Sequence, residues 1–418
     1  MSDLQFDARL RSTGRIAADI DVLSGPRYTS ADHAIRRYAY VPEYGATLDF
    51  LATEFRALGF TVEHDPVGTF VARNRQSGTP VFGIGSHCDS NRNGGAYDGT
   101  LGVVTALEIC RMNREQGLDH PLQVIAFLEE EGSGFGQMLL GSRIMAGLIS
   151  DDELAQIRAI DDERTFFEHA RDAGYAPEDW RASGRFLDDL VGWIEIHIEQ
   201  GRVLHDADEP IGLVTAIAGY EHGDVTIEGR ADHAGATPMR MRVDAALVAA
   251  ETTVELERLA IAAGRGTVGT VGELTLEPGW INVVPGGARM SLDVRGTDDE
   301  AVAVVMRDIV AFAERSALGR GGQAVYRRRV HVPATPMDTS ILDALHAAAE
   351  RCGEPFRAMP SGAAHDTMCV AAHRPTGMVF VPCDEGISHS PLERAHPSDA
   401  ALAAEITLDA IGALIGRA

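Results

Sequence analysis

Residues 81–90 read VFGIGSHCDS, a short apolar segment that ends in small and polar residues. Residues 81–85 have the length and composition of a buried strand, and residues 100–115 carry apolar side chains at helical spacing. Further strand-like runs lie at 122–128, 192–198 and 378–381. Strands that alternate with helices predict an α/β domain built on a mixed, mostly parallel sheet.

The pattern changes between residues 212 and 330. The predicted elements are a strand at 224–229, a helix at 244–263, strands at 267–276 and 288–294, a helix at 299–316 and a strand at 323–330. The order β-α-β-β-α-β is that of a ferredoxin-like α+β domain. Because the first pattern then returns, we predict a discontinuous domain at 1–211 and 331–418 with a smaller domain inserted at 212–330.

Charge and composition exclude several classes of partner. The formal net charge is −25, so nucleic acid and anionic membrane surfaces would repel the protein. No apolar run approaches the length of a membrane span, and the first residues lack the regions of a secretory signal. Five scattered cysteines without a C-x-x-C spacing indicate reduced thiols. We therefore expect a cytoplasmic protein with no nucleic-acid or membrane partner.

Acidic and imidazole side chains recur where the predicted strands end. His87 follows the first strand, three glutamates at 129–131 follow the second, His197 lies in the third, and His389 follows the last. In open α/β sheets, sites form at the carboxyl ends of the strands. Asp98 opens the helix that begins near residue 100, where a carboxylate is favourable and can bridge two metal ions.

This set of side chains predicts a centre for two divalent metal ions. Imidazole and carboxylate without thiolate suit zinc first, with manganese or cobalt as alternatives. Two-metal centres of this kind usually catalyse hydrolysis. Each residue alone has a plainer interpretation, because a single His is more often structural, a Glu run is usually solvated and Asp-Gly is usually a turn. Their joint placement favours the metal centre over these interpretations.

Seven motifs carry a family resemblance. They are SHCD at 86–89, GGAYDG at 94–99, EEEGS at 129–133, HIEQG at 197–201, HAGATPM at 233–239, SGAAHD at 361–366 and GISHS at 386–390. Together they span nearly the whole chain and resemble the hydantoinase/carbamoylase branch of the M20 metallopeptidase-like amidohydrolases. That branch contains N-carbamoyl-L-amino-acid hydrolases, β-ureidopropionases and allantoate amidohydrolases.

The resemblance implies that the discontinuous domain is the catalytic one and holds two metal ions per subunit. The implied ligands are His87 and His197 for one ion, Glu131 and His389 for the other, and Asp98 between them. Glu130 is the implied general base. Asp89 would orient His87 and fix its tautomer. His197 stands where the peptidase branches have an acidic ligand.

The resemblance also implies that the inserted domain mediates dimerisation, acts as a lid and binds substrate. His233 would come from the second subunit of a homodimer and stabilise the developing oxyanion. Asn282 and Arg295 would bind the substrate carboxylate, and a guanidinium suits that role because it makes a two-pronged contact. Gln200 and His365 are further candidates for contacts to a ureido group.

The implied activity is hydrolysis of the linear C–N amide bond of an N-carbamoyl (ureido) group on a small carboxylic acid. One position departs from the family pattern: Gly134 stands where Arg is usual.

Two alternatives stay open. A dipeptidase or aminoacylase of the same superfamily is disfavoured by His197, Asn282 and Arg295. A non-catalytic homologue that binds a ureido compound is disfavoured by the intact Glu130 and ligand set.

Overall fold

The computed structural model describes residues 3–29 and 34–416. The chain divides into two compact units, of which the first comprises Met1–Thr215, Met337–Met359 and Ala364–Ala418. The second comprises Ala216–Pro336 and Pro360–Ala363. The division at 216 lies past the predicted boundary at 212 because strand β6 (Ile211–Ile217) begins in the sheet of the first unit. No helix in the described segments is both long and apolar enough for a membrane span.

The first unit is built on a mixed sheet with the strand order β1-β2-β4-β3-β5-β16-β6. Its strands are β1 (Thr61–His64), β2 (Phe70–Arg73), β3 (Val81–His87), β4 (Leu122–Phe127), β5 (Leu190–Ile198), β6, β15 (Phe356–Ser361) and β16 (Thr376–Val381). Its longer helices are α1 (Asp3–Leu23), α2 (Pro42–Ala57), α3 (Thr100–Glu115), α11 (Thr339–Cys352) and α13 (Pro397–Ile415). Its shorter helical segments are α4 (Leu140–Met145), α5 (Asp151–Gln156), α6 (Phe166–Asp172), η1 (Pro177–Gly184), α7 (Arg185–Asp188), α8 (Val203–Ala207), α12 (Thr367–Val370) and η3 (Asp384–Gly386).

The central strands of this sheet pair in parallel. β3 pairs in parallel with β4 and β5, and β5 pairs in parallel with β16. The pairs β1–β2, β2–β4 and β6–β16 are antiparallel. The prediction of a mixed α/β sheet is therefore confirmed, but "mostly parallel" is wrong for its outer strands. β1 and β2 are joined by a short turn, and such a connection permits only antiparallel neighbours.

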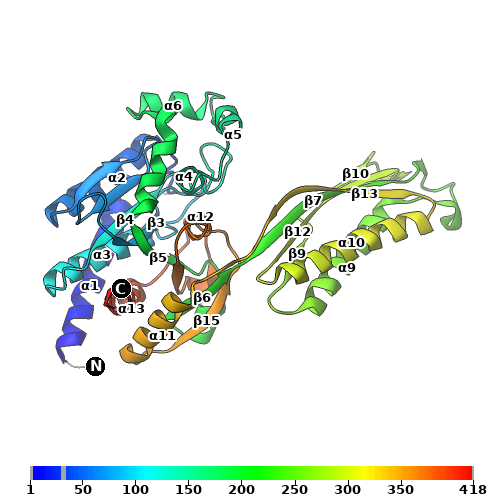
Figure 1. Cartoon of the computed structure of the whole chain (residues 1–418). Coiled ribbons are helices and arrows are strands. Elements are labelled where there is room, and N and C mark those ends of the chain that lie inside the picture. The colour runs from blue at the N-terminus through cyan, green and yellow to red at the C-terminus, as the bar shows by residue number, and fades with distance from the viewer. Residues whose placement is uncertain (1–2, 30–33, 417–418) are drawn as a thin grey trace. The chain divides into compact units, whose positions relative to one another are not determined.

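Helices cover both faces of the central strands (Figure 1). In β5, Ile194 and Ile196 point into a core shared with α1, α2, α3, α11 and α13, while Trp193 packs on the other face with residues of α4, α7 and α12. This alternation follows from the two-residue period of a strand. Because the central strands are parallel, the ends of β3, β4, β5 and β16 meet at one edge of the sheet.

The second unit has an antiparallel sheet in the order β10-β12-β7-β13, with its core between the sheet and two helices (Figure 1). Its elements are β7 (Gly219–Glu228), β8 (Asp232–His233), η2 (Met239–Met241), α9 (Ala245–Ala263), β9 (Val268–Thr270), β10 (Leu274–Glu277), β11 (Val283–Val284), β12 (Gly287–Gly296), α10 (Asp299–Gly319), β13 (Gln323–Val332) and β14 (Thr335–Pro336). Asp244 and Asp298 cap the two helices with their side chains.

The strand predicted at 267–276 is broken into β9 and β10. Both pieces pair with β12, but the register is interrupted between them. Oγ of Ser291 accepts the backbone N–H of Glu273 over 2.9 Å, and the N–H of Ser291 bonds the carbonyl of Glu273 over 3.0 Å. This local exchange of partners interrupts the strand, and periodicity alone does not reveal it.

Candidate metal centre

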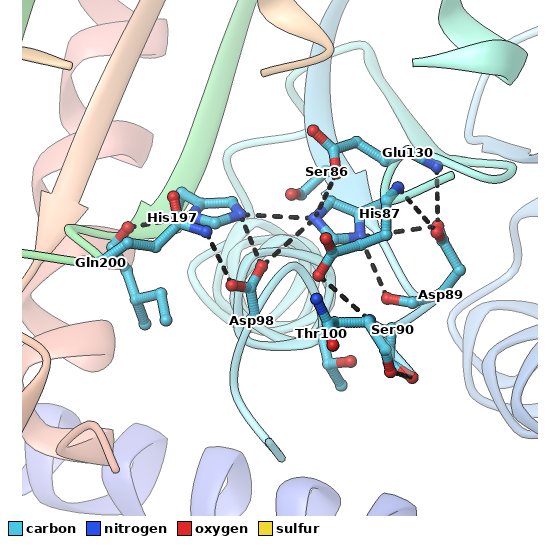
Figure 2. Close-up of polar contacts among 12 residues, drawn as sticks. Ser86, His87, Asp89, Ser90, Asp98, Thr100, Glu130, His197 and Gln200 are labelled. Atoms are coloured by element: carbon cyan, nitrogen blue, oxygen red, sulfur yellow. Dashed lines mark hydrogen bonds and ion pairs between the residues drawn. The ribbon is translucent and has the colours of Figure 1, made fainter. Parts of the chain in front are cut away.

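Three potential ligand atoms meet at the end of β3. His87 ends that strand, His197 lies near the end of the parallel strand β5, and Asp98 precedes α3 (Figure 2). The Nε2 atoms of His87 and His197 are 3.4 Å apart, and Oδ1 of Asp98 lies 3.5 Å and 3.2 Å from them. Tetrahedral zinc ligands at bond lengths near 2.0–2.2 Å are roughly 3.3–3.6 Å apart. The spacing of the three buried side chains therefore fits a metal ion.

The second nitrogen of each ring explains why Nε2 faces inward. Nδ1 of His87 lies 3.1 Å from the carbonyl oxygen of Asp89, and Nδ1 of His197 lies 2.9 Å from that of Ile198. If each Nδ1–H donates to its carbonyl, each Nε2 presents a lone pair to Oδ1 of Asp98. Acceptor atoms that face one another in a buried site repel unless a cation lies among them. This donor set fits a divalent ion.

A second group shares Asp98. Nε2 of His389 lies 3.5 Å from Oδ2 of Asp98 and 3.4 Å from Oε1 of Glu131. These three atoms form another set with the spacing of metal ligands. One oxygen of Asp98 thus faces His87 and His197, and the other faces Glu131 and His389. This is the arrangement that a carboxylate needs to bridge two ions.

Proton equilibria in this cluster are strongly perturbed. Burial raises the pKa of Asp98, but the charge of His197 and its hydrogen bond outweigh burial and hold that pKa well below its usual range. Burial and the charge of Asp98 raise the pKa of Glu131 to about 7. A hydrogen bond to Asp98 raises the pKa of His389 to about 9. In the metal-free protein, bound protons therefore offset part of the negative charge that bound cations would offset. Metal binding would release these protons.

Glu130 is buried beside the first group of ligand atoms. Its Oε2 lies 3.7 Å from Nε2 of His87 (Figure 2). Burial raises its pKa well above the usual range, although the charge of His87 opposes the rise. Asp89 holds the loop that follows β4. Its Oδ1 accepts the backbone N–H of Glu130 over 3.1 Å, and its Oδ2 accepts that of Glu131 over 3.0 Å. Its Oδ1 also lies 3.5 Å from Nδ1 of His87.

The glutamate run is not solvated surface. Glu129 is fully buried, and its carboxylate accepts N–H groups from Ala39, Gly134 and Phe135 at 3.0, 2.5 and 2.8 Å. A Cβ atom at Gly134, where the family usually has Arg, would lie 3.1 Å from that carboxylate. The position that departs from the family therefore lies against Glu129.

Backbone strain gathers at this edge of the sheet. Glu129, Gln200 and His389 have φ values of 55°, 59° and 54°, in the left-handed region that residues other than glycine rarely adopt. Gly99 also has positive φ, and a Cβ there would overlap the ring of His87. Such conformations persist where the surroundings enforce them, which is common at functional sites.

His365 lies against the first group without joining it. Its ring centroid is 4.6 Å from that of His197, and burial holds its pKa well below the usual range. His365, His197 and Glu195 form a third possible ligand set. However, the carboxylate of Glu195 already accepts hydrogen bonds from Ser86 at 3.0 Å and from the Thr367 hydroxyl at 2.7 Å. Glu195 is thus engaged in holding β5 to β3 and to the start of α12.

Of the other predicted residues, Gln200 follows β5 in the first unit, whereas His233, Asn282 and Arg295 belong to the second unit. His233 lies on β8, which pairs with β11, and the backbone of Ala234 bonds the carbonyl of Asn282 over 3.0 Å. His233 and Asn282 are therefore neighbours within this unit. Arg295 lies on β12, where Nε and Nη2 bond Asp293 at 3.0 and 2.9 Å.

Sequence reasoning missed residues that support the ligand candidates. Nδ2 of Asn91 lies 3.1 Å from Nδ1 of His389, and Oγ of Ser388 donates to Oδ2 of Asp98 over 2.8 Å. Glu393, only 3% exposed, bonds the backbone at Asp98. Ser388 lies within a quoted motif, but nothing in the sequence distinguishes Glu393 from a solvated loop acid.

Comparison with known proteins gives a consistent result. The profile of peptidase family M20/M25/M40 matches residues 85–413. The N-carbamoyl-L-amino-acid amidohydrolase of Paenarthrobacter aurescens is 36% identical over 405 residues, which cover 96% of this chain and 97% of the relative. The allantoate amidohydrolase of Bacillus subtilis is 31% identical and covers 87% of this chain and 89% of its own. A solved hydantoinase/carbamoylase family amidase from Burkholderia multivorans has a TM-score of 0.86 at 29% identity, covering 97% of both chains.

Proposed function

The chain belongs to the M20/M25/M40 peptidase family, as its motifs predicted, and on that premise we propose that it is a metal-dependent amidohydrolase. The reaction is hydrolysis of the linear C–N amide bond of an N-carbamoyl (ureido) group on a small carboxylic acid. One observation carries this proposal: the two oxygens of Asp98 face two separate sets of potential ligand atoms beside the buried Glu130.

His87, Asp98 and His197 would hold one ion, and Asp98, Glu131 and His389 the other, with zinc first among the candidates. When bound, such ions generate a nucleophile from water at neutral pH and polarise the carbonyl oxygen. Glu130 takes the proton from the attacking water and returns it to the leaving nitrogen. Its Oε2 lies 3.7 Å from Nε2 of His87, so the carboxylate lies beside the atoms that would hold the first ion.

Residues of the second unit would recognise the substrate. Asp293 occupies Nε and Nη2 of Arg295, while Nη1 lies 3.4 Å from the carbonyl of Gly362. The outer edge of the guanidinium therefore still offers N–H groups for a substrate carboxylate, and the exposed Asn282 adds a neutral donor.

His233 fits a role as a donor to the oxyanion. Its Nδ1 accepts the backbone N–H groups of Gly235 and Ala236, both over 3.1 Å. Its proton then lies on Nε2, and the ring is exposed. An exposed Nε2–H group can donate to an oxyanion in a second subunit.

We propose that a second copy of the chain covers an apolar strip of the inserted unit. Leu247, Val254 and Ile261 repeat every seven residues along α9, and the last two are 67% and 74% exposed. Val268 and Leu274, on the adjoining β9 and β10, are also exposed. A strip of this kind along a helix and a sheet edge suits a two-fold interface.

A substrate screen tests the proposal. Zinc-, manganese- and cobalt-loaded protein would be incubated with N-carbamoyl-amino acids, β-ureidopropionate and allantoate, and ammonia release would be measured. We expect release from at least one ureido acid. Dipeptides and N-acyl-amino acids serve as the comparison set, and their cleavage would be followed by the amino acids that it releases. Cleavage of that set alone would favour a dipeptidase or aminoacylase, and no cleavage of either set would favour a non-catalytic binding protein.

A further inference from the structure

Glu393 is a buried carboxylate to which the proposed chemistry gives no role. It is 3% exposed and lies four residues after His389, before α13. Its Oε1 accepts the backbone N–H of Tyr97 over 2.8 Å and that of Asp98 over 2.9 Å. One oxygen atom thus fixes two consecutive amides at the point where the chain presents the Asp98 side chain.

The same segment also bonds the side chain of Asp98. Oγ of Ser388 donates to Oδ2 of Asp98 over 2.8 Å and lies 3.2 Å from Oε2 of Glu393. Residues 388–393 therefore supply a ligand candidate in His389, a bond to the Asp98 carboxylate from Ser388, and bonds to the backbone at Asp98 from Glu393.

The loop that carries Asp98 is shaped to receive Glu393. A Cβ atom at Gly95 would overlap both Cβ and the carboxylate of Glu393. Glycine at this position therefore lets the Glu393 carboxylate reach the amides of Tyr97 and Asp98. The Glu393 side chain thus occupies the space that a side chain at position 95 would need.

The ligand candidates differ in how they are held. His87 and His197 lie on the central strands β3 and β5 and are 1% exposed. His389 lies in a loop, and its side chain is 45% exposed. The first pair keeps its position through the sheet, whereas His389 depends on contacts between loops.

We propose that Glu393 is a positioning residue that links the His389 loop to the Asp98 loop and so secures the second metal ion. The inference rests on the proposed metal centre and deepens it. Without the carboxylate, the buried amide of Asp98 and the partly buried amide of Tyr97 lose their acceptor, and the loops separate to recover hydrogen bonds with water. The ion between Asp98, Glu131 and His389 is then lost first, while His87 and His197 still hold the other.

Metal content tests this directly. Wild type, Glu393→Ala, Glu393→Gln and Glu393→Asp would be loaded with zinc, desalted and assayed by elemental analysis and by competition with a chromophoric chelator. We expect two ions per chain in wild type and about one in Glu393→Ala, with affinity for the second ion reduced at least tenfold. Glu385 is an exposed acid of the preceding segment η3, so Glu385→Ala is the matched control and should keep both ions.

The conservative variants separate positioning from charge. Glutamine keeps the oxygen that accepts both amides, and its NH2 group can donate to Ser388, so Glu393→Gln should retain two ions. Aspartate keeps the charge but is too short to reach both amides, so Glu393→Asp should lose the second ion. If circular dichroism shows that Glu393→Ala does not fold, the metal content of Glu393→Asp tests the inference instead. Retention by Glu393→Asp together with loss by Glu393→Gln would overturn the inference.

Other outcomes separate this inference from the proposed function. If Glu393→Ala holds two ions as tightly as wild type, the inference is wrong and the metal centre stands. If wild type holds fewer than two ions, the metal centre and the inference both fail. If wild type holds two ions but cleaves no ureido acid, only the proposed substrate class fails.

Discussion

Nε2 of Gln200 lies 2.8 Å from Oδ2 of Asp98 and donates a hydrogen bond to it. Its Oε1 is buried and has no hydrogen-bond partner within the described part of the chain. One end of this amide therefore supports the carboxylate proposed to bridge the ions. The other end is an acceptor that a ureido N–H group would satisfy, in line with the predicted substrate contact.

Replacement of Gln200 should affect metal and substrate together. Gln200→Ala should weaken metal binding by about tenfold, the size of effect that partners of metal ligands usually have, and should raise KM for ureido acids. Asp98→Ala is the reference variant and should lose both ions. Elemental analysis and steady-state kinetics measure the two effects. Full metal occupancy in Asp98→Ala would refute the proposed bridge.

Glu130 and Glu131 should separate chemistry from metal binding. Glu130→Gln should keep both ions and lose roughly 10²- to 10⁴-fold in turnover, because an amide cannot take the proton. Glu131→Gln should lose an ion instead. Metal content and kcat, measured on the same samples, distinguish the two variants. The reverse pattern would show that the two roles are exchanged.

Arg295→Ala should lower kcat/KM for ureido acids roughly 10- to 100-fold, the range for a lost hydrogen bond to a charged group. Neutral amide analogues should change little, because they lack the carboxylate. Arg289→Ala is the control, since Arg289 lies on the same strand and its side chain is 61% exposed. Equal loss on acids and amides would mean that Arg295 has a structural role.

His233 should act across a dimer. Glu130→Gln and His233→Ala homodimers should each be nearly inactive, while mixed dimers contain one site with both residues intact. Random reassembly of equal amounts should restore roughly a quarter of the wild-type sites, as two-fold symmetry requires. Native mass spectrometry would verify the mixed dimers. No recovery would place His233 in the site of its own subunit or remove it from the mechanism.

Affinity for the second ion should rise with pH. In the metal-free protein the pKa of His389 is raised to about 9 and that of Glu131 to about 7. Both groups bind protons below these values, and protons compete with the ion. Apparent affinity should therefore increase about tenfold per pH unit between 7 and 9 and more steeply below 7. Zinc competition at several pH values measures this, and a flat profile between pH 7 and 9 would contradict it.

Local pattern was sufficient to predict the central strands and the residues at their ends. Apolar runs mark buried strands, and His87 and His197 differ chemically from the residues around them. The directions of β1 and β2 depend on a short connection that periodicity does not report. The role of Glu393 depends on two loops separated by nearly 300 residues. The position of Arg37 could not be predicted either. Its guanidinium is fully buried and bonds Thr100, whereas a lone Arg in a sequence is usually interpreted as a surface residue.

The position of β16 between β5 and β6 has a consequence for biosynthesis. Roughly 180 residues separate the end of β5 from the start of β16. At 5–20 residues per second, the ribosome needs about 10–40 s to make them. Before this interval ends, the continuous segment 216–336 has all its strands, whereas the first sheet still lacks β16 between β5 and β6. His389 emerges later still, so the nascent chain can complete the metal centre only near the end of synthesis.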